Sequence, residues 1–183
     1  MIIQHIDINI LYWIQNNLQN SFLNPIMIFF TSLGNLGLIW IAISMLLILS
    51  KKYRKIGLLT LAALIVNTIL GEGILKHIIE RPRPFITYPD LHIIIPKPTS
   101  YSMPSGHTSA SFAAAFMLAY SFKNLKVYIY LLASLIAFSR LYLLVHYPSD
   151  VLAGILLGYI SFLIVIKTYN FIKFKKKIKR VLS

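Results

Sequence analysis

The sequence predicts an all-α protein, a polytopic transmembrane helix bundle of five or six spans with an interfacial helix at its N-terminus. Of the 183 residues, 57% are hydrophobic and only 13% are charged. That charged share is about half the usual one, so the surface of a soluble domain could not be covered with polar side chains. The apolar residues also fall in long uncharged runs, as membrane spans do. We expect residues 1–183 to form one domain.

The spans follow from the positions of these runs. No Lys, Arg, Asp or Glu occurs between Asp7 and Lys51, which leaves room for one crossing near residues 25–50. The four further spans are expected at residues 56–75, 105–122, 127–145 and 151 to about 172. Residues 1–20 mix apolar and amide side chains, which favours an amphipathic helix in the interface, with a sixth crossing as the alternative. Residues 173–183 form a basic tail.

The basic residues indicate the orientation of the chain. Alternating the sides of the five spans places 13 of the 18 basic residues on one face: Lys51, Lys52, Arg54, Lys55, Lys123, Lys126, Lys167, Lys173, Lys175, Lys176, Lys177, Lys179 and Arg180. The opposite face receives the other five basic residues and all five acidic ones. By the positive-inside rule that opposite face is extracytoplasmic, and the C-terminus is cytoplasmic. We therefore expect a multi-pass protein of the cell membrane.

Several other functions are excluded or disfavoured. The formal charge of +13 is divided among small basic clusters between apolar runs, which argues against a nucleic-acid-binding face. The absence of Cys removes disulfides, thiolate nucleophiles and zinc knuckles. The N-terminus shows no basic region and no cleavage site of a removable signal peptide. Abundant Ile, Lys and Asn hint at an AT-rich, bacterial genome.

Small residues recur at helical spacing in two spans. Gly154 and Gly158 form a GxxxG pair, and Gly106, Ala110 and Ala114 form a second row. Such rows let helix backbones approach closely in membranes. We expect both rows to pack helices.

Three short segments at the outer boundary hold nearly all the polar residues that a plain bundle leaves unexplained. In the first, Lys76, Arg81 and Arg83 could each be a snorkelling or anchoring cation. However, Pro82 and Pro84 end the helix there, so the two guanidinium groups stand on an irregular loop. Together these cations form a positively charged rim.

The second segment predicts an anion site at a helix start. Ser105 is a good N-cap, and Gly106 adds backbone freedom where free N–H groups favour an anion. A cap alone is common. His107 adds a titratable donor at the place where a phosphate would bind.

The third segment joins the fourth span to the fifth. Arg140 could snorkel or could face an anion inside the bundle. His146 and Asp150 are four residues apart, so the carboxylate can reach one ring nitrogen and leave the other free to react. An interfacial His–Asp pair without catalytic function is equally compatible with this segment taken alone.

The combination favours phosphoryl transfer. That chemistry needs cations and N–H donors for the phosphate oxygens, a nucleophile, and an acid for the leaving oxygen. All of these come from three separate segments on one side of the membrane.

At these residues the sequence resembles the type 2 phosphatidic acid phosphatase (PAP2) superfamily, which includes bacterial undecaprenyl-pyrophosphate phosphatases. The family pattern K-x6-RP, PSGH and SR-x5-H-x3-D is met without substitution between Lys76 and Asp150. The resemblance implies a metal-independent phosphatase without a cofactor, acting on a membrane lipid phosphate.

The resemblance also implies roles for single residues. His146 would attack phosphorus to form a phosphohistidine, Asp150 would orient His146, and His107 would protonate the leaving oxygen. The phosphate oxygens would be bound by Lys76, Arg83, Ser105, Gly106 and Arg140. Arg81 lies outside the motif positions and is a possible head-group contact. Independently, His5, His77 and His92 are scattered, which speaks against a metal site.

Two features beside the motifs remain open. Glu72 precedes Lys76 by one turn, which suits either an ion pair that steers the ammonium or a passive carboxylate. Residues 85–103 form an outer loop that could cover the head group.

For the substrate we favour undecaprenyl pyrophosphate, because a compact chain suits a linear pyrophosphate on one polyprenyl tail. The alternatives are phosphatidylglycerol phosphate and phosphatidic acid. A lipid-phosphate binding or transport protein without hydrolysis is a different class, which would not need the two histidines and the aspartate.

Overall fold

The computed structural model describes residues 2–182, with side chains up to Lys175 and that of Lys177, and this part of the chain is helical without strands. Its main helices are α1 (Ile2–Asn17), α2 (Leu23–Leu33), α3 (Leu38–Leu49), α4 (Arg54–Thr68), α5 (Lys76–Ile79), α6 (Pro84–Thr87), α7 (Gly106–Ser121), α8 (Lys126–Tyr142) and α9 (Pro148–Leu182). Shorter elements are the 3-10 turns η1 (Asn35–Gly37) and η3 (Lys123–Leu125) and the π-helix η2 (Ile69–Leu75). The expected all-α class is confirmed.

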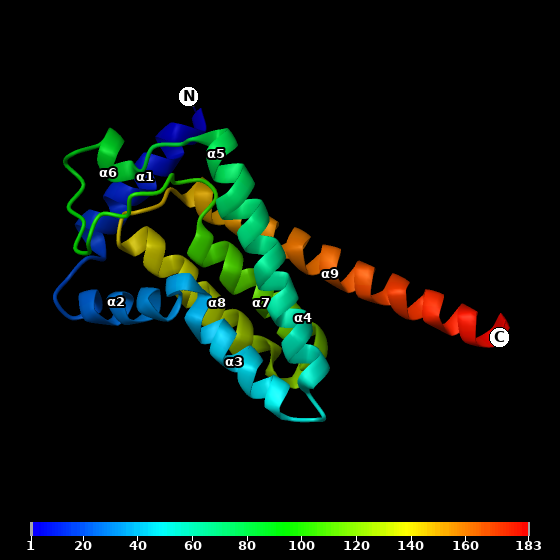
Figure 1. Cartoon of the computed structure of the whole chain (residues 1–183). Coiled ribbons are helices and arrows are strands. Elements are labelled where there is room, and N and C mark those ends of the chain that lie inside the picture. Colours follow the sequence, from blue (N-terminus) through cyan, green and yellow to red (C-terminus); the bar gives the residue numbers. More distant parts are fainter. Residues whose placement is uncertain (1, 183) are drawn as a thin grey trace.

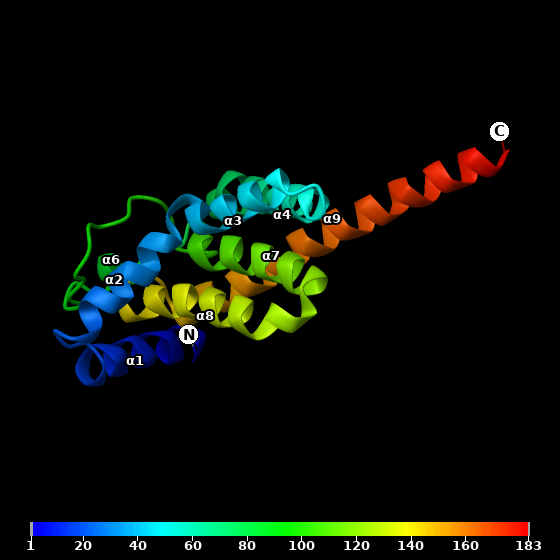
Figure 2. The same ribbon diagram turned by 90° about the horizontal axis from the view of Figure 1, so that it is seen from below.

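Helix α7 lies at the centre of the bundle, against α4, α8 and α9 (Figures 1 and 2). Small residues permit this packing: a Cβ at Gly158 would come 2.7 Å from the backbone nitrogen of Ala113, and one at Gly154 would come 2.9 Å from the carbonyl oxygen of Ser105. The packing predicted for this pair is confirmed. In the second row Ala114 is fully buried, whereas Gly106 and Ala110 face a cavity.

Three helical stretches are long and apolar enough to cross a membrane: Arg54–Thr87, Lys123–Tyr142 and Pro148–Lys175. A fourth is present if Leu23–Leu33 and Asn35–Leu49, which meet at a 48° bend, count as one. Helix α7 falls short of a usual span at 16 residues. The membrane bundle is therefore confirmed, and the count of five or six spans stays a prediction.

Helix α1 packs on α8 and α9 with Ile8, Leu11 and Ile14, and exposes Ile3 and Trp13 on its other side. It ends at Asn17, within the predicted range of residues 1–20. Apolar side chains on its exposed face suit contact with lipid, and its place at the interface stays a prediction.

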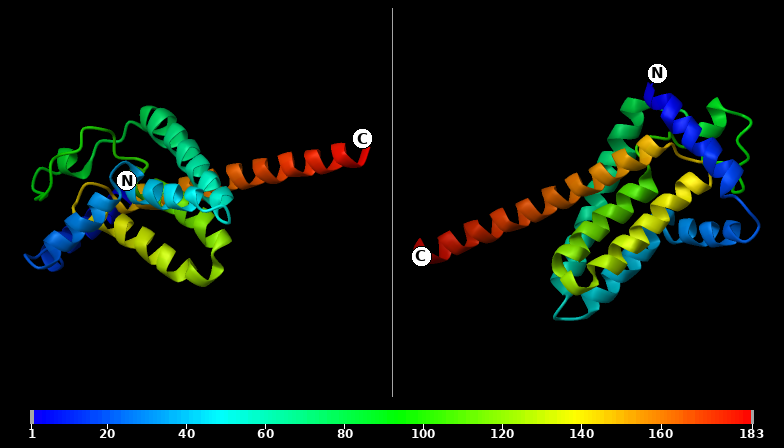
Figure 3. Two further views of the ribbon diagram at one scale, coloured as in Figure 1. Left: turned by 60° about the horizontal axis from the view of Figure 1, so that its bottom comes forward. Right: turned by 180° about the vertical axis from the view of Figure 1, so that it is seen from behind.

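The two ends of the bundle differ in composition. The turn before α4 and the η3 turn, with their lysines, lie at one end, and α5, α6 and the loop that follows lie at the other (Figure 1). Helix α9 starts at the end that carries α5 and α6 and extends well beyond the bundle (Figure 3). The predicted tail from residue 173 thus continues this helix to Leu182, and Ser183 is outside the described residues.

Candidate active site

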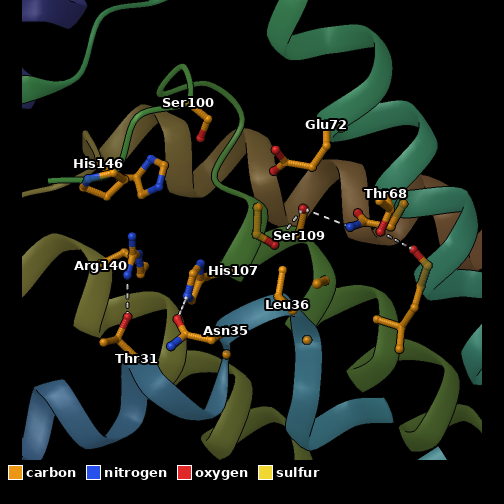
Figure 4. Close-up of a pocket in the computed structure, with 18 of the residues that line it drawn as sticks. Thr31, Asn35, Leu36, Thr68, Glu72, Ser100, His107, Ser109, Arg140 and His146 are labelled. Carbon is orange, nitrogen blue, oxygen red and sulfur yellow. Dashed lines mark hydrogen bonds between the residues drawn. The ribbon is translucent and has the colours of Figure 1, made fainter. Parts of the chain in front are cut away.

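The three polar segments meet around one cavity of about 910 Å³ at the end of the bundle near α5. Six of the nine residues singled out from the sequence line it: Lys76, Arg83, Gly106, His107, Arg140 and His146. Figure 4 shows His146, Arg140, His107 and Glu72 around this shared space. Residues far apart in the sequence are therefore brought together as expected.

Backbone geometry delivers His146 to the cavity. Leu144, fully buried between α8 and α9, has a φ of 58°, in the left-handed region that costs a non-glycine residue about 1 kcal/mol or more. This reverses the chain after α8, and the amide of Val145 donates back to the carbonyl of Arg140 at 3.2 Å. His146 and Arg140 thus stand close to each other by local folding.

His146 is held as a neutral imidazole whose lone pair is on Nε2. Its Nε2 lies 3.2 Å from Nη1 of Arg83, and because a guanidinium can only donate, Nε2 accepts. The ring proton is therefore on Nδ1, which lies 3.5 Å from Oδ2 of Asp150. The pKa of His146 is lowered to about 3, mainly by burial and also by the charges of Arg140 and Arg83, while the hydrogen bond and the charge of Asp150 act in the opposite direction.

Asp150 lies directly behind His146 and is fully buried. Its Oδ2 accepts from the Ser102 hydroxyl at 2.5 Å and from the backbone N–H of Tyr147 at 2.8 Å. The 3.5 Å contact to His146 is longer than a usual hydrogen bond, so the carboxylate acts on the imidazole mainly through its charge.

Arg83 is the most extensively hydrogen-bonded cation of the site and is 3% exposed. Its Nε donates to the carbonyl of Ser100 at 2.7 Å, and its Nη1 donates to the carbonyl of Val145 at 2.9 Å. Its Nη2 donates to the Ser100 hydroxyl at 3.1 Å. These bonds fix the plane of the guanidinium beside His146.

Lys76 begins α5 directly after the π-helix η2, a deviation that often marks functional sites. Its Nζ lies 2.8 Å from Oε1 of Glu72 and donates to the Ser100 hydroxyl at 3.2 Å. The ion-pair alternative for Glu72 is thereby confirmed. A Cβ at Gly106 would lie 2.4 Å from the same Glu72 oxygen, so the carboxylate occupies the space over the start of α7.

The remaining two cavity groups are held by the α2–η1 segment. Nη1 of Arg140 donates to the Thr31 hydroxyl at 2.5 Å, while its buried Nε has no partner among the described residues. Nε2 of His107 lies 2.9 Å from Oδ1 of Asn35. Arg140 thus keeps donor capacity for a ligand.

Two predicted contacts differ in the structure. Ser105 is fully buried and does not line the cavity, and its hydroxyl accepts from Thr108 at 3.0 Å, so its side chain does not point at a phosphate. Arg81 also lies outside the cavity, because it pairs with Asp7 at 2.8 Å and with Asp150 at 2.6 Å. Arg81 is thus occupied by two carboxylates, and its head-group contact stays a prediction that this geometry does not favour.

Below the polar groups the cavity becomes apolar. Its wall there includes Leu36 and Ile41 from η1 and α3, and Leu61, Ile65 and Ile69 from α4 and η2. Leu36, Ile65 and Ile69 are exposed side chains. The cavity therefore has exposed apolar side chains on both of its walls, from η1 on one side and from α4 and η2 on the other.

Sequence reasoning missed the residues that support the site from elsewhere. Ser100 and Ser102 lie in the outer loop at residues 85–103, and they bind Arg83, Lys76 and Asp150. No motif marks either serine. In the described part of the chain, no three His, Cys, Asp or Glu side chains gather as metal ligands.

The arrangement is suited to attack on a phosphorus atom. Three cations can bind phosphate oxygens, a neutral imidazole presents a lone pair, and a second histidine faces the same cavity. A tetrahedral anion needs such convergent donors, and the apolar wall suits a hydrocarbon chain.

Comparisons with known proteins point the same way. Residues 52–174 match the model of the PAP2 superfamily. An undecaprenyl-diphosphatase of Sulfolobus acidocaldarius is 38% identical over 163 residues, which are 87% of this chain and 78% of that protein.

Two solved structures are also similar. The crystal structure of Aquifex aeolicus LpxE has a TM-score of 0.78 and 29% identity, and the match covers 88% of this chain and 95% of that one. That of a transmembrane PAP2-type phosphatidylglycerolphosphate phosphatase from Bacillus subtilis has a TM-score of 0.72 and 30% identity, with 97% and 88% covered.

Proposed function

Because the chain belongs to the PAP2 superfamily of lipid phosphatases, we propose that it hydrolyses a polyprenyl pyrophosphate through a phosphohistidine on His146. The observation that carries this proposal is the continuity of the cavity. One part holds Arg83, Arg140 and His146, and the other is mainly apolar and is lined by the exposed side chains of Leu36, Ile65 and Ile69. A phosphate bound in the polar part would leave its tail in hydrocarbon.

In the first step, the Nε2 lone pair of His146 forms a bond to the terminal phosphorus. The bond from that phosphorus to the bridging oxygen breaks, and the oxygen leaves with its electron pair. His107 gives this oxygen a proton, and Arg83 and Arg140 stabilise the charge on the equatorial oxygens. Asp150 stabilises the positive charge that the imidazole of His146 acquires.

In the second step, water attacks the phosphohistidine. His107, now neutral, takes the proton of the water, and the N–P bond breaks with its electron pair returning to Nε2. Inorganic phosphate is released, and both histidines regain their starting states. The residues supply every proton transfer, so no metal ion and no cofactor is assigned a role.

The polyprenyl substrate is supported by the shape of the site and by one relative. The apolar part of the cavity lies between the two helices α3 and α4, which suits a single linear tail. The relative from Sulfolobus acidocaldarius bears the name undecaprenyl-diphosphatase. We therefore place undecaprenyl pyrophosphate before phosphatidylglycerol phosphate and phosphatidic acid.

We also propose that the site faces the extracytoplasmic side. The lysine-rich turns lie at the end of the bundle opposite the cavity, and positive loops stay in the cytoplasm. Since α7 connects these two ends, it would cross the membrane despite its 16 residues and complete a set of five spans.

The proposal is tested by phosphate release from four substrates in the presence of a chelator. Purified protein in detergent micelles is given undecaprenyl pyrophosphate, phosphatidylglycerol phosphate, phosphatidic acid or a soluble monoester. We expect the highest kcat/KM on the pyrophosphate and none above background on the monoester. Faster turnover of phosphatidylglycerol phosphate would move the assignment to that lipid, and binding without release would indicate a non-hydrolytic protein.

A further inference from the structure

Arg81 connects the N-terminal helix to the catalytic aspartate. Its Nη2 lies 2.8 Å from Oδ2 of Asp7 in α1, and its Nη1 lies 2.6 Å from Oδ1 of Asp150 in α9. The guanidinium also stacks 3.9 Å from the ring centre of Tyr147. Both carboxylates are buried, at 2% and 0% exposure, so water screens these charges little.

Ser149 closes the same network at the start of α9. Its backbone N–H donates to Oδ1 of Asp7 at 2.9 Å, and its hydroxyl donates to the other oxygen of Asp7. Nη1 of Arg81 donates to this hydroxyl at 2.7 Å. Asp7 thus satisfies a first-turn donor of the helix that carries Asp150, although it lies outside the residues 52–174 that match the family model.

The charges of Asp7, Arg81 and Asp150 alternate in sign, and their sum acts on the imidazole of His146. Arg81 alone would offset the negative charge of Asp150. Asp7 offsets Arg81 in turn, so the three groups together keep a charge of −1 behind the imidazole, which becomes positive during phosphoryl transfer. This charge matters because Oδ2 of Asp150 acts on His146 across 3.5 Å through the field.

We propose that Asp7 and Arg81 are positioning residues that set the charge which Asp150 presents to His146. The inference rests on the proposed phosphohistidine chemistry. Neither residue touches the substrate, since neither lines the cavity.

The proposal predicts that Asp7→Asn and Arg81→Gln change the protonation of His146 in opposite directions. The other charged or titratable groups around His146 are Arg83, Arg140 and, in the same cavity, His107, Lys76 and Glu72, and all five stay unchanged. Asp7→Asn removes a negative charge and makes protonation of His146 harder. Arg81→Gln removes a positive charge and makes it easier.

The test measures kcat/KM against pH for the full-length protein with the lipid phosphate that the wild type hydrolyses fastest. We expect the acid limb to move down by about half a pH unit in Asp7→Asn and up by about as much in Arg81→Gln. Asp90→Asn is the matched control. Asp90 also binds α1, because its carboxylate accepts from the Tyr12 hydroxyl at 2.6 Å. This variant also removes one negative charge, but the charge is not part of the network around Asp150. It should leave the limb in place.

A purely structural role would lower activity in both variants without moving the limb in opposite directions, and that result overturns the proposal. If Asp7→Asn does not fold, the double variant Asp7→Asn/Arg81→Gln is compared with Arg81→Gln alone. The acid limb of the double variant must then lie at lower pH than that of Arg81→Gln. Absence of wild-type turnover on every lipid would instead refute the proposed function, so the two failures are distinguishable.

Discussion

The ion pair between Glu72 and Lys76 is expected to lower the affinity of the site for phosphate by a calculable amount. Among the described residues that line the cavity, Glu72 is the single carboxylate, and it lies over the start of α7 where an anion would bind. Its side chain is 47% exposed, so the 2.8 Å pair is worth about 0.5–1 kcal/mol. A substrate phosphate that binds Lys76 has to displace the carboxylate and overcome this energy.

Glu72→Gln should therefore strengthen phosphate binding. Removing 0.5–1 kcal/mol of competition corresponds to a roughly two- to fivefold lower KM for the lipid and a similarly lower inhibition constant for inorganic phosphate. Both are measured by steady-state phosphate release. Glu80→Gln is the control, because Glu80 accepts from the Tyr101 hydroxyl at 3.1 Å and lies outside the cavity. A higher KM in Glu72→Gln would refute competition and show that Glu72 holds Lys76 in place.

Three further outcomes are expected. His107→Ala should slow release of the polyprenyl phosphate in the first turnover, because the leaving oxygen loses its acid, and quenched-flow detection of that product checks it. The pKa of His146, about 3 in the folded protein against 6.5 unfolded, means that the unfolded state binds more protons between these values. Stability should thus be full above pH 6.5 and fall below it, and the fall in Tm between pH 7 and 5 should shrink in His146→Gln. Gly158→Ala should lower Tm in detergent by several degrees, because its Cβ meets backbone atoms of α7, whereas Gly73→Ala, with nothing within 4 Å, should not.

The helix boundaries around the candidate site could be predicted from the sequence because they follow local rules. Prolines after Lys76 end a helix, Ser105 and Gly106 start another, and His146 precedes Asp150 by four residues across a helix start. These rules act within a few residues of the chain, so spacing alone shows which side chains share one end of the bundle.

The parts that escaped prediction depend on tertiary packing. Arg81 resembles any rim arginine in the sequence, and only the docking of α1 brings Asp7 against it, 74 residues away. Ser100 and Ser102 stand in an irregular loop whose path has no periodicity. The resemblance implies a phosphate contact for Ser105, but its hydroxyl is buried and accepts from Thr108, which local sequence rules do not show.

The most direct measurement is the trapping of the covalent intermediate. Protein mixed with substrate labelled on the terminal phosphate is quenched in base, where phosphohistidine survives, and the label is mapped by mass spectrometry. The phosphohistidine mechanism predicts an acid-labile phosphoryl group on His146. This group should be absent from His146→Gln and reduced in Asp150→Asn. Label on another residue, or turnover without any phosphoenzyme in rapid-quench samples, would contradict it.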